Sequence, residues 1–506
     1  MRKQIGQVGA WTLASRVVGF GRDILMAAIL GAGPVADAFL IAFRLPNHFR
    51  AIFAEGAFNT AYVPSYSRVR ATEGETAAAR FASRIFSLQL LVQLGLLAAA
   101  LAATPWLLKL LAPGFDADPA KFALAVELTR ITFPYLLLIS CMTVLAGTLN
   151  ARERFAAAAA APVLMNVMMI AGLVSWRWFP TVGHAAAWGV LAAGIAQLAL
   201  LWGAARRAGA APRWLKPALD ADTRQFFKAL GPATIGSMGV QIALFADTII
   251  ASFLSTGALS ALYYADRINQ LPVGVIGIAA GTVLLPEMAK KIAAGDEDGA
   301  ARAQNRAMEF TLLLAAPCVV AFLMTPTLIM TGLFQRGRFD AAAATAAGQT
   351  LAAYALGLVA FVLIRSVVAS FHARGDTATP LKASLTAIAA NVALKVVLMG
   401  PLAQVGLALA TSLGAWLNIG IVGWLAHRRG LFAFDSRFKR SALVIGAASA
   451  TLAVALALGT QPIAELAYQL PRLRAEAALG GTALLGAIAY FGALWLGFKG
   501  KLPSRR

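Results

Sequence analysis

Charged residues interrupt the first two apolar segments of the chain, where the surrounding sequence is apolar enough to lie in a membrane. A charge at the centre of a membrane-spanning helix costs roughly 2.5–3.5 kcal/mol on insertion scales. Four arginines there cost on the order of 10 kcal/mol unless they face water, a counter-ion or an anionic ligand. We therefore predict a cationic, hydrated cavity inside the membrane that suits an anion. The charged residues of these segments are Arg16, Arg22, Asp23, Asp37, Arg44 and Arg50.

In the first segment, the spacing of the charges indicates which of them share a helix face. Arg16 and Asp23 are seven positions apart, so in a regular helix they lie on one face and are expected to pair. Arg22 is then expected to point elsewhere, into the cavity. The alternative is that Arg22 and Asp23 sit at a helix end with their charged groups reaching the interface.

The second segment contains a proline among its charges. Pro46 has no backbone N–H, so the helix is expected to kink or break there. Irregular backbone at membrane depth is tolerated only beside protein or a wet cavity, which places Arg50 near the cavity. Glu55 follows shortly after. It is interpreted either as an internal counter-ion for Arg44 or Arg50 or as a direct ligand contact.

The chain repeats itself at an offset of 221 to 224 residues. Arg44 falls opposite Arg267, and Ala151-Arg152 recurs as Ala373-Arg374. An even number of predicted spans separates the copies, so both halves have the same orientation, and the substrate path of such parallel repeats lies at their interface. An arginine from each half suits a polyanion, because guanidinium binds phosphate oxygens in bidentate fashion. The alternative for Arg267 is a surface pair with Asp266.

A second polar set lies in later apolar segments. Asp247 is placed at mid-membrane depth, as is Lys395 beside Asn391. A carboxylate there must be paired, protonated or bound to a cation. We hypothesise that the ammonium of Lys395 neutralises Asp247 in the place of a cation.

The composition indicates the elements that position these residues. The chain has 506 residues, of which 59% are hydrophobic and 13% charged, with a mean hydropathy of +0.72; soluble proteins carry about 25% charged residues. Apolar stretches recur throughout, each long enough to cross a hydrocarbon core of about 30 Å. We predict an all-α polytopic membrane protein with about fourteen transmembrane helices. Two six-helix lobes at 1–220 and 221–430 surround the cavity, and 431–506 adds two helices and a cytoplasmic tail.

The net charge of +21 would suggest nucleic acid as a partner of a soluble protein, but here the positive-inside rule accounts for most of it. If the N-terminus is cytoplasmic, nearly all loop arginines and lysines fall on that side, so both termini are predicted to be cytoplasmic. The predicted outer loops hold only Lys121, Arg336, Arg338, Arg472 and Arg474.

No catalytic constellation is visible in the sequence. The four histidines are too scattered for a metal site, and no P-loop motif is present. We therefore predict that the chain is not an enzyme and uses no metal or cofactor. Transport driven by an ion gradient or by the membrane potential remains.

Four segments resemble one known family over the whole chain. SRVVGFGRDILMA, ADAFLIAFRLPNHFRAIFAEGAFNTAYVP, YYADRINQLPVGVIGIAAGTVLLPEM and FHARGDTATP are similar to the lipid II flippase family (MurJ/MviN type). That family belongs to the multidrug/oligosaccharidyl-lipid/polysaccharide exporter superfamily. The resemblance implies movement of lipid II, the undecaprenyl-pyrophosphate-linked peptidoglycan precursor, from the inner to the outer leaflet of the bacterial inner membrane.

The resemblance also implies roles for particular residues. Arg16, Arg22, Asp37, Arg50 and Arg267 match charged positions on which the family's activity depends. The two C-terminal helices resemble the family's groove for the lipid tail. Some relatives bind sodium at positions that correspond to Asp247 and Asn391, but Lys395 departs from that pattern. The implied partners are lipid II, membrane lipids and cell-wall synthesis proteins, and the chain is expected to function as a monomer.

Other functions are compatible with parts of this pattern. A flippase for another undecaprenyl-linked polysaccharide repeat unit would present a different head group on the same carrier lipid. A drug or cation antiporter is disfavoured because an arginine-rich cavity repels cations. A scaffold of the cell-wall machinery would have no use for buried arginines.

Overall fold

The computed structural model describes residues 2–53 and 57–498, and within them the regular structure is entirely helical. The chain divides into two compact units, Met1–Gly257 and Ala258–Arg506. Nine helices of the described residues are long and apolar enough to cross a membrane. These features confirm the predicted all-α polytopic fold, while the count of about fourteen spans and the division at 220 and 430 stay predictions.

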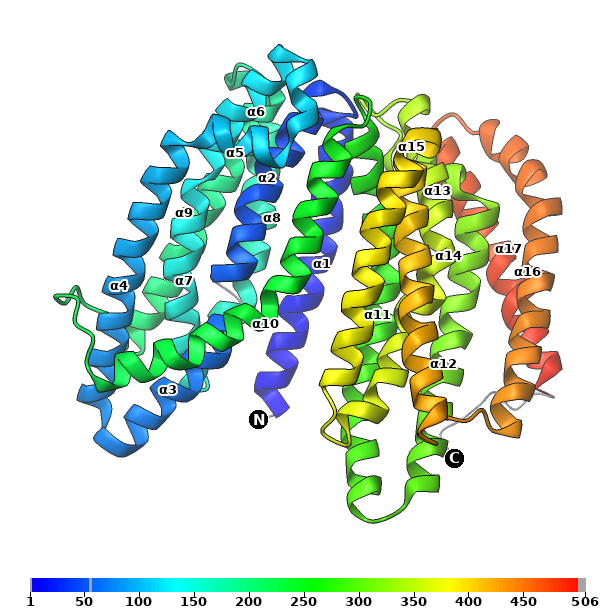
Figure 1. Cartoon of the computed structure of the whole chain (residues 1–506). Coiled ribbons are helices and arrows are strands. Elements are labelled where there is room, and N and C mark those ends of the chain that lie inside the picture. Colours follow the sequence, from blue (N-terminus) through cyan, green and yellow to red (C-terminus); the bar gives the residue numbers. More distant parts are fainter. Residues whose placement is uncertain (1, 54–56, 499–506) are drawn as a thin grey trace. The chain divides into compact units, whose positions relative to one another are not determined.

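The first unit holds ten α-helices (Figure 1). They are α1 (Arg2–Leu30), α2 (Pro34–Phe53), α3 (Ala57–Glu73), α4 (Glu75–Ala102), α5 (Thr104–Leu111), α6 (Pro119–Thr132), α7 (Pro134–Ala151), α8 (Ala156–Val174), α9 (Val182–Arg207) and α10 (Ala221–Ser252). α1 packs on α8, α2 on α6, and α10 on α3 and α2. α10, which the sequence-based division assigns to the second lobe, therefore packs within the first unit.

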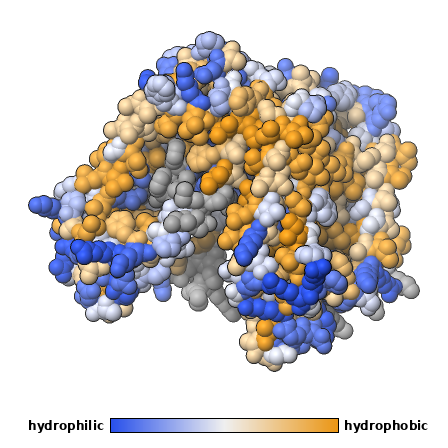
Figure 2. Space-filling view, viewed as in Figure 1, coloured by the Kyte–Doolittle hydropathy of each residue, from blue (hydrophilic) through white to orange (hydrophobic). Residues whose placement is uncertain are grey.

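The second unit holds the remaining seven α-helices. They are α11 (Ala258–Ala293), α12 (Glu297–Met324), α13 (Pro326–Phe334), α14 (Ala341–His372), α15 (Ala378–Arg428), α16 (Ser436–Tyr468) and α17 (Arg474–Gly497). α15 is two helices that join at a sharp bend, because Ala403 has non-helical backbone angles (φ 46°, ψ −128°). α16 and α17 pack side by side (Figure 1). Hydrophobic surface covers much of the helices' length, and hydrophilic residues gather toward their ends (Figure 2).

The break expected at Pro46 does not occur, since α2 continues through Pro46 to Phe53. Proline has no N–H to donate to the carbonyl four residues earlier, which here belongs to Ala42. The hydroxyl of Thr132 on α6 donates to that carbonyl at 2.8 Å. A side-chain hydrogen bond thus satisfies the acceptor that the proline leaves open, and the helix is not interrupted.

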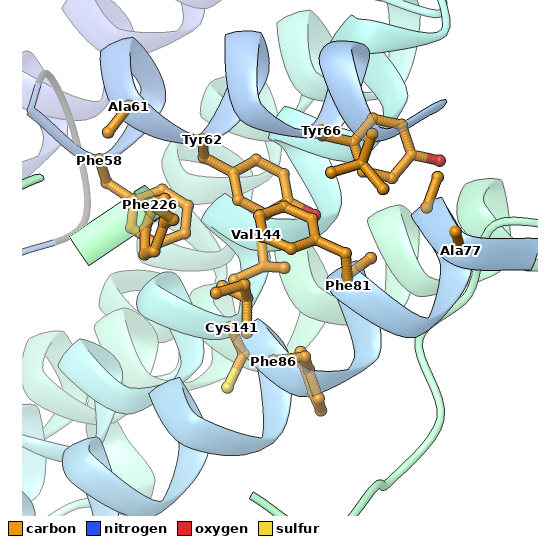
Figure 3. Close-up of a cluster of buried hydrophobic side chains, with 14 residues drawn as sticks. Phe58, Ala61, Tyr62, Tyr66, Ala77, Phe81, Phe86, Cys141, Val144 and Phe226 are labelled. Atoms are coloured by element: carbon orange, nitrogen blue, oxygen red, sulfur yellow. The ribbon is translucent and has the colours of Figure 1, made fainter. Parts of the chain in front are cut away.

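An aromatic cluster holds the polar helix α3 against the first unit (Figure 3). Tyr62 stacks on Phe58 and Phe81, with ring centroids 5.2 Å and 5.8 Å away, and Phe226 of α10 meets Tyr62 edge-on. The Tyr62 hydroxyl lies 2.7 Å from the hydroxyl of Thr148 on α7. Aromatic pairs of this geometry add about 0.5–1.5 kcal/mol beyond the apolar area that they bury. The cluster therefore fixes α3 to α4, α7 and α10.

The internal repeat is visible in matched ion pairs. Glu75, the first residue of α4, pairs with Arg152 after α7. Glu297, the first residue of α12, pairs with Arg374 after α14. Both glutamates and both arginines are related by an offset of 222 (297 − 75 and 374 − 152). The two halves therefore repeat in their side-chain contacts as well as in sequence.

Candidate functional site

Two buried charges of the first unit, Arg22 and Asp23, lie side by side on α1 and are 6% and 4% exposed. The Arg22 Nη2 and Nε atoms donate to Asp23 Oδ1 at 2.6 Å and 3.1 Å. Arg22 Nη1 donates to Asn166 Oδ1 on α8 at 2.9 Å. The guanidinium is therefore held by a carboxylate and an amide inside the unit.

Asn166 also fixes the approach of α8 to α1. Its Nδ2 donates to the backbone carbonyl of Ser15 at 3.0 Å, and a Cβ at Gly19 would lie 3.1 Å from the same nitrogen. Glycine at this position gives the amide the room to reach α1. Sequence reasoning missed Asn166, although an asparagine within the very apolar α8 was a signal that could have identified it.

The pairing within α1 differs from the one expected. Asp23 forms an ion pair with its neighbour Arg22, whereas Arg16 is exposed and, among the described residues, forms no ion pair. The expectation rested on helical spacing alone. It failed because the long Arg22 side chain bends back to the adjacent carboxylate and is held there from α8.

Asp37 is 1% exposed and lies near the start of α2. Its Oδ2 accepts the backbone N–H of Gly257 at 2.8 Å. Gly257 has a left-handed backbone (φ 91°) that favours glycine. Asp37 therefore binds the turn that follows α10 to the start of α2.

The remaining candidates on α2 are only partly placed. Arg44 is half-buried, and the Nε2 of nearby His48 lies 3.2 Å from the hydroxyl of Thr248 on α10. Arg50 belongs to α2, but its side chain lies outside the described part of the structure, as does the whole of Glu55. The predicted roles of Arg50 and Glu55 stay predictions.

In the second unit, Arg267 lies on α11 and is half-buried. Its guanidinium carbon is 4.8 Å from the centre of the Tyr263 ring, and its Nη2 donates to the Tyr263 hydroxyl at 3.1 Å. Asp266 accepts a hydrogen bond from Gln270 at 3.2 Å. An aromatic face attracts the guanidinium without neutralising its charge.

The residues of the predicted cation site belong to both units. Asp247 is on α10, while Asn391 and Lys395 are on the first part of α15. The Asn391 Nδ2 donates to the carbonyl of Ala410 at 3.2 Å, across the bend of α15. Lys395 is 4% exposed. The pair between Lys395 and Asp247 stays a prediction.

Comparison with known proteins now gives the family. A family model described as lipid II flippase MurJ matches residues 26–469. The chain belongs to the lipid II flippase MurJ family. The probable lipid II flippase MurJ of Rhizobium meliloti is 42% identical over 464 residues, covering 90% of this chain and 86% of the relative. The lipid II flippase MurJ of Burkholderia cenocepacia is 31% identical over 510 residues, covering 99% and 98%.

Solved structures show the same fold. That of a lipid II flippase MurJ in an inward closed conformation matches with a TM-score of 0.78 at 22% identity, over 97% of this chain and 98% of that chain. A multidrug resistance MATE family transporter of the MOP superfamily, inward-facing, gives a TM-score of 0.68 at 16% identity, over 84% and 96%. The family predicted from the sequence motifs is confirmed. With its apolar helices, membership of the MurJ family makes the chain a multi-span protein of the bacterial inner membrane.

Proposed function

We propose that this protein is a transporter that flips lipid II from the cytoplasmic to the periplasmic leaflet for cell-wall synthesis. Membership of the MurJ family and the names of its relatives support this function. The observation that carries it is the buried Arg22–Asp23 pair held by Asn166 inside an apolar unit. A buried, hydrogen-bonded arginine in a membrane protein marks a substrate path.

The arginines supply the chemistry for an anionic head group. Lipid II carries a pyrophosphate, and guanidinium groups bind phosphate oxygens in bidentate fashion. The donors of Arg22 are directed to Asp23, Asn166 and the Met169 sulfur, so in this state Asp23 occupies the place of an anion. We infer that a substrate phosphate competes with Asp23 for Arg22, while Arg267 supplies a guanidinium from the second repeat.

The rest of the mechanism follows the expectations from sequence. Both termini are placed in the cytoplasm, and the two repeats alternate access to a hydrated cavity. α16 and α17 supply an apolar groove for the isoprenoid tail. The Lys395 ammonium neutralises Asp247 where some relatives are expected to bind sodium, and the protein acts as a monomer alongside cell-wall synthesis proteins.

The test measures lipid II at the outer face of cells depleted of this protein. Cells are complemented with wild type, Arg22→Ala, Arg267→Ala or the control Arg428→Ala, all at matched protein levels. Arg428 carries the same charge but stacks on Trp424, 4.1 Å from the ring centre, at the end of α15. We expect wild type and Arg428→Ala to restore exposure of lipid II, and the other two to fail.

Two results would contradict the proposal in different ways. If depletion leaves the exposure of lipid II unchanged, the substrate is wrong, and another undecaprenyl-linked repeat unit takes its place. If Arg22→Ala and Arg267→Ala restore exposure as well as the control does, the substrate stands and the role of the arginines falls.

A further inference from the structure

A cavity of about 370 Å³ lies in the first unit, away from the Arg22 cluster, where α1, the turn between α7 and α8, and the end of α9 meet. Arg154 comes from the turn, and Arg207 is the last residue of α9. Gln7 and Glu153 add further polar groups, and Leu149 and Phe155 form part of the apolar wall. The cavity therefore joins two arginines to an apolar surface.

The two arginines lack a protein anion. Among the residues that the structure describes, neither the side chain of Arg154 nor that of Arg207 forms a hydrogen bond or an ion pair. Glu153 also lines the cavity but takes part in an interaction of its own. The lining thus carries two positive charges and one negative charge, and its arginine donors are available to a ligand.

The corresponding position in the second repeat holds a carboxylate. Arg429 corresponds to Arg207 (429 − 207 = 222), and Asp376 corresponds to Arg154 (376 − 154 = 222). Arg429 Nη1 donates to Asp376 Oδ2 at 2.7 Å. The second unit therefore supplies its own carboxylate to the arginine at the end of α15. The first unit has a second arginine where that carboxylate would be.

The turn that carries these residues has the same backbone shape in both repeats. Gly375 has a φ of 78°, and its counterpart Glu153 (375 − 153 = 222) has a φ of 59°. A glutamate in this left-handed region is uncommon. Asp376 also accepts the backbone N–H of Thr379 at 2.9 Å, and the N-cap residues of α8 and α15 both form no side-chain cap. The backbone of this turn is therefore repeated in the first unit, but the Asp376 carboxylate has no counterpart there.

We propose that this cavity binds the phosphate of an anionic phospholipid from the surrounding leaflet, in the place that the Asp376 carboxylate fills in the second repeat. Arg154 lies two residues before α8 and Arg207 ends α9, and both helices are apolar enough to span the membrane. The two guanidinium groups therefore lie at the level of lipid head groups, and the apolar wall accommodates the start of an acyl chain. The proposal does not depend on which substrate is transported.

The experiment measures lipid binding to the purified full-length protein by native mass spectrometry. The probes are dioleoyl phosphatidylglycerol, dioleoyl phosphatidylethanolamine and inorganic phosphate. We expect phosphatidylglycerol to bind most tightly, and Arg154→Gln and Arg207→Gln each to weaken it about tenfold, as the loss of a hydrogen bond between charged groups predicts. The matched control is Arg206→Gln, which removes the same charge one residue away from a guanidinium that faces Trp202 at 5.9 Å. It should bind like wild type.

A second variant tests the repeat argument directly. Arg154→Asp places a carboxylate opposite Arg207, as Asp376 stands opposite Arg429, so it should abolish binding of phosphatidylglycerol without lowering the melting temperature. Three results would each overturn the proposal. They are binding by Arg154→Asp equal to that of wild type, an equal loss in Arg206→Gln, and binding of inorganic phosphate as tight as that of the lipid.

Discussion

The segment that follows α9 and the segment that follows α15 are held by corresponding helices, α4 and α12, through different contacts. In the first unit, Arg84 of α4 pairs with Asp220, which caps α10 by accepting the Thr223 N–H at 2.9 Å. The Ser87 hydroxyl accepts the N–H of Leu215 at 3.1 Å. Arg152 Nη1 also donates to the Ala208 carbonyl at 3.2 Å, and Arg68 pairs with Asp222 in the first turn of α10 at 2.7 Å. This segment and the start of α10 are therefore held by partly exposed charged pairs and by hydrogen bonds to the backbone.

The second unit keeps the ion pair and adds a buried charge. Arg306 of α12 pairs with Asp435, the cap of α16. Glu309, the counterpart of Ser87 (309 − 87 = 222), is 3% exposed and binds Arg306 and the Ser441 hydroxyl. Burial raises the pKa of Asp435, but the Phe438 N–H and the Arg306 guanidinium outweigh it and hold the pKa below its ordinary value.

The two segments lead into helices that pack differently. The first segment leads into α10, which packs on several helices of its unit. The second leads into α16, which contacts α12 and pairs with α17. A buried carboxylate with several partners, Glu309, holds the first turns of α16. The start of α10 is held by the partly exposed pairs of Arg84 and Arg68, with the neutral Ser87 at the position of Glu309. Removing one of these contacts should therefore lower the free energy of unfolding more in the second repeat than in the first.

The largest effect is expected for Glu309→Ala. Removing a hydrogen bond to a charged group costs roughly 1.5–3 kcal/mol, and here both Arg306 and the Ser441 hydroxyl lose a buried acceptor. Thermal unfolding in detergent should show a clear fall in melting temperature. Ser87→Ala is the matched change in the first repeat and should cost about 1 kcal/mol, since it removes one neutral hydrogen bond. Equal losses of stability in the two variants would refute the proposed difference between the repeats.

A smaller effect is expected from the shared ion pairs. The side chains of Arg84 and Asp220 are 29% and 33% exposed, and those of Arg306 and Asp435 are 26% and 32% exposed. Double-mutant cycles with glutamine and asparagine should give couplings of about 1 kcal/mol in each repeat. A coupling that is several times larger in one repeat would show that the two pairs are not equivalent.

The outer ion pairs should contribute less. Glu75 and Glu297 are 56% and 59% exposed at their side chains, and exposed pairs contribute about 0–1 kcal/mol and are screened by salt. Glu75→Gln and Glu297→Gln should each change the stability by less than about 1 kcal/mol, and by less again in 0.5 M salt. A larger, salt-independent loss in either would mean that the pair has a buried role.

The smallest effect concerns Asp376, whose side chain is 28% exposed. The backbone N–H and hydroxyl of Thr379, followed by Arg429, lower its pKa from 3.8 to about 2. A carboxylate with a depressed pKa stabilises the folded state above its unfolded pKa and loses that contribution as the pH falls through the folded value. Asp376→Asn should therefore flatten the stability profile between about pH 4 and pH 2. An unchanged slope there would show that Asp376 does not contribute.

Sequence reasoning identified the features that depend on composition and order along the chain. The apolar segments predicted the all-α class, and the collinear repeat placed Arg152 opposite Arg374, two residues that form matching ion pairs in the structure. The FHARGDTATP motif even contains Asp376. Such features are visible because hydropathy and spacing are one-dimensional properties.

What escaped prediction depends on contacts between distant helices. Helical spacing favoured Arg16 as the partner of Asp23, but Asn166 reaches across from α8 and fixes Arg22 instead. Pro46 was expected to kink or break its helix, and nothing in the local sequence showed that Thr132 would donate to the Ala42 carbonyl of an unbroken helix. Glu309 gave no signal as a single carboxylate before its partners from α16 were in place.

The hydrogen bond from Thr132 to Ala42 has a mechanical consequence. It joins α6 to the middle of α2, next to the residue where a proline-containing helix would otherwise bend. In an apolar surrounding no water is at hand to replace the donor, so separating the two groups is costly. α2 and α6 should therefore move as one rigid body during transport. Any displacement of Asp37 or Arg44 would then be transmitted to α6 without loss.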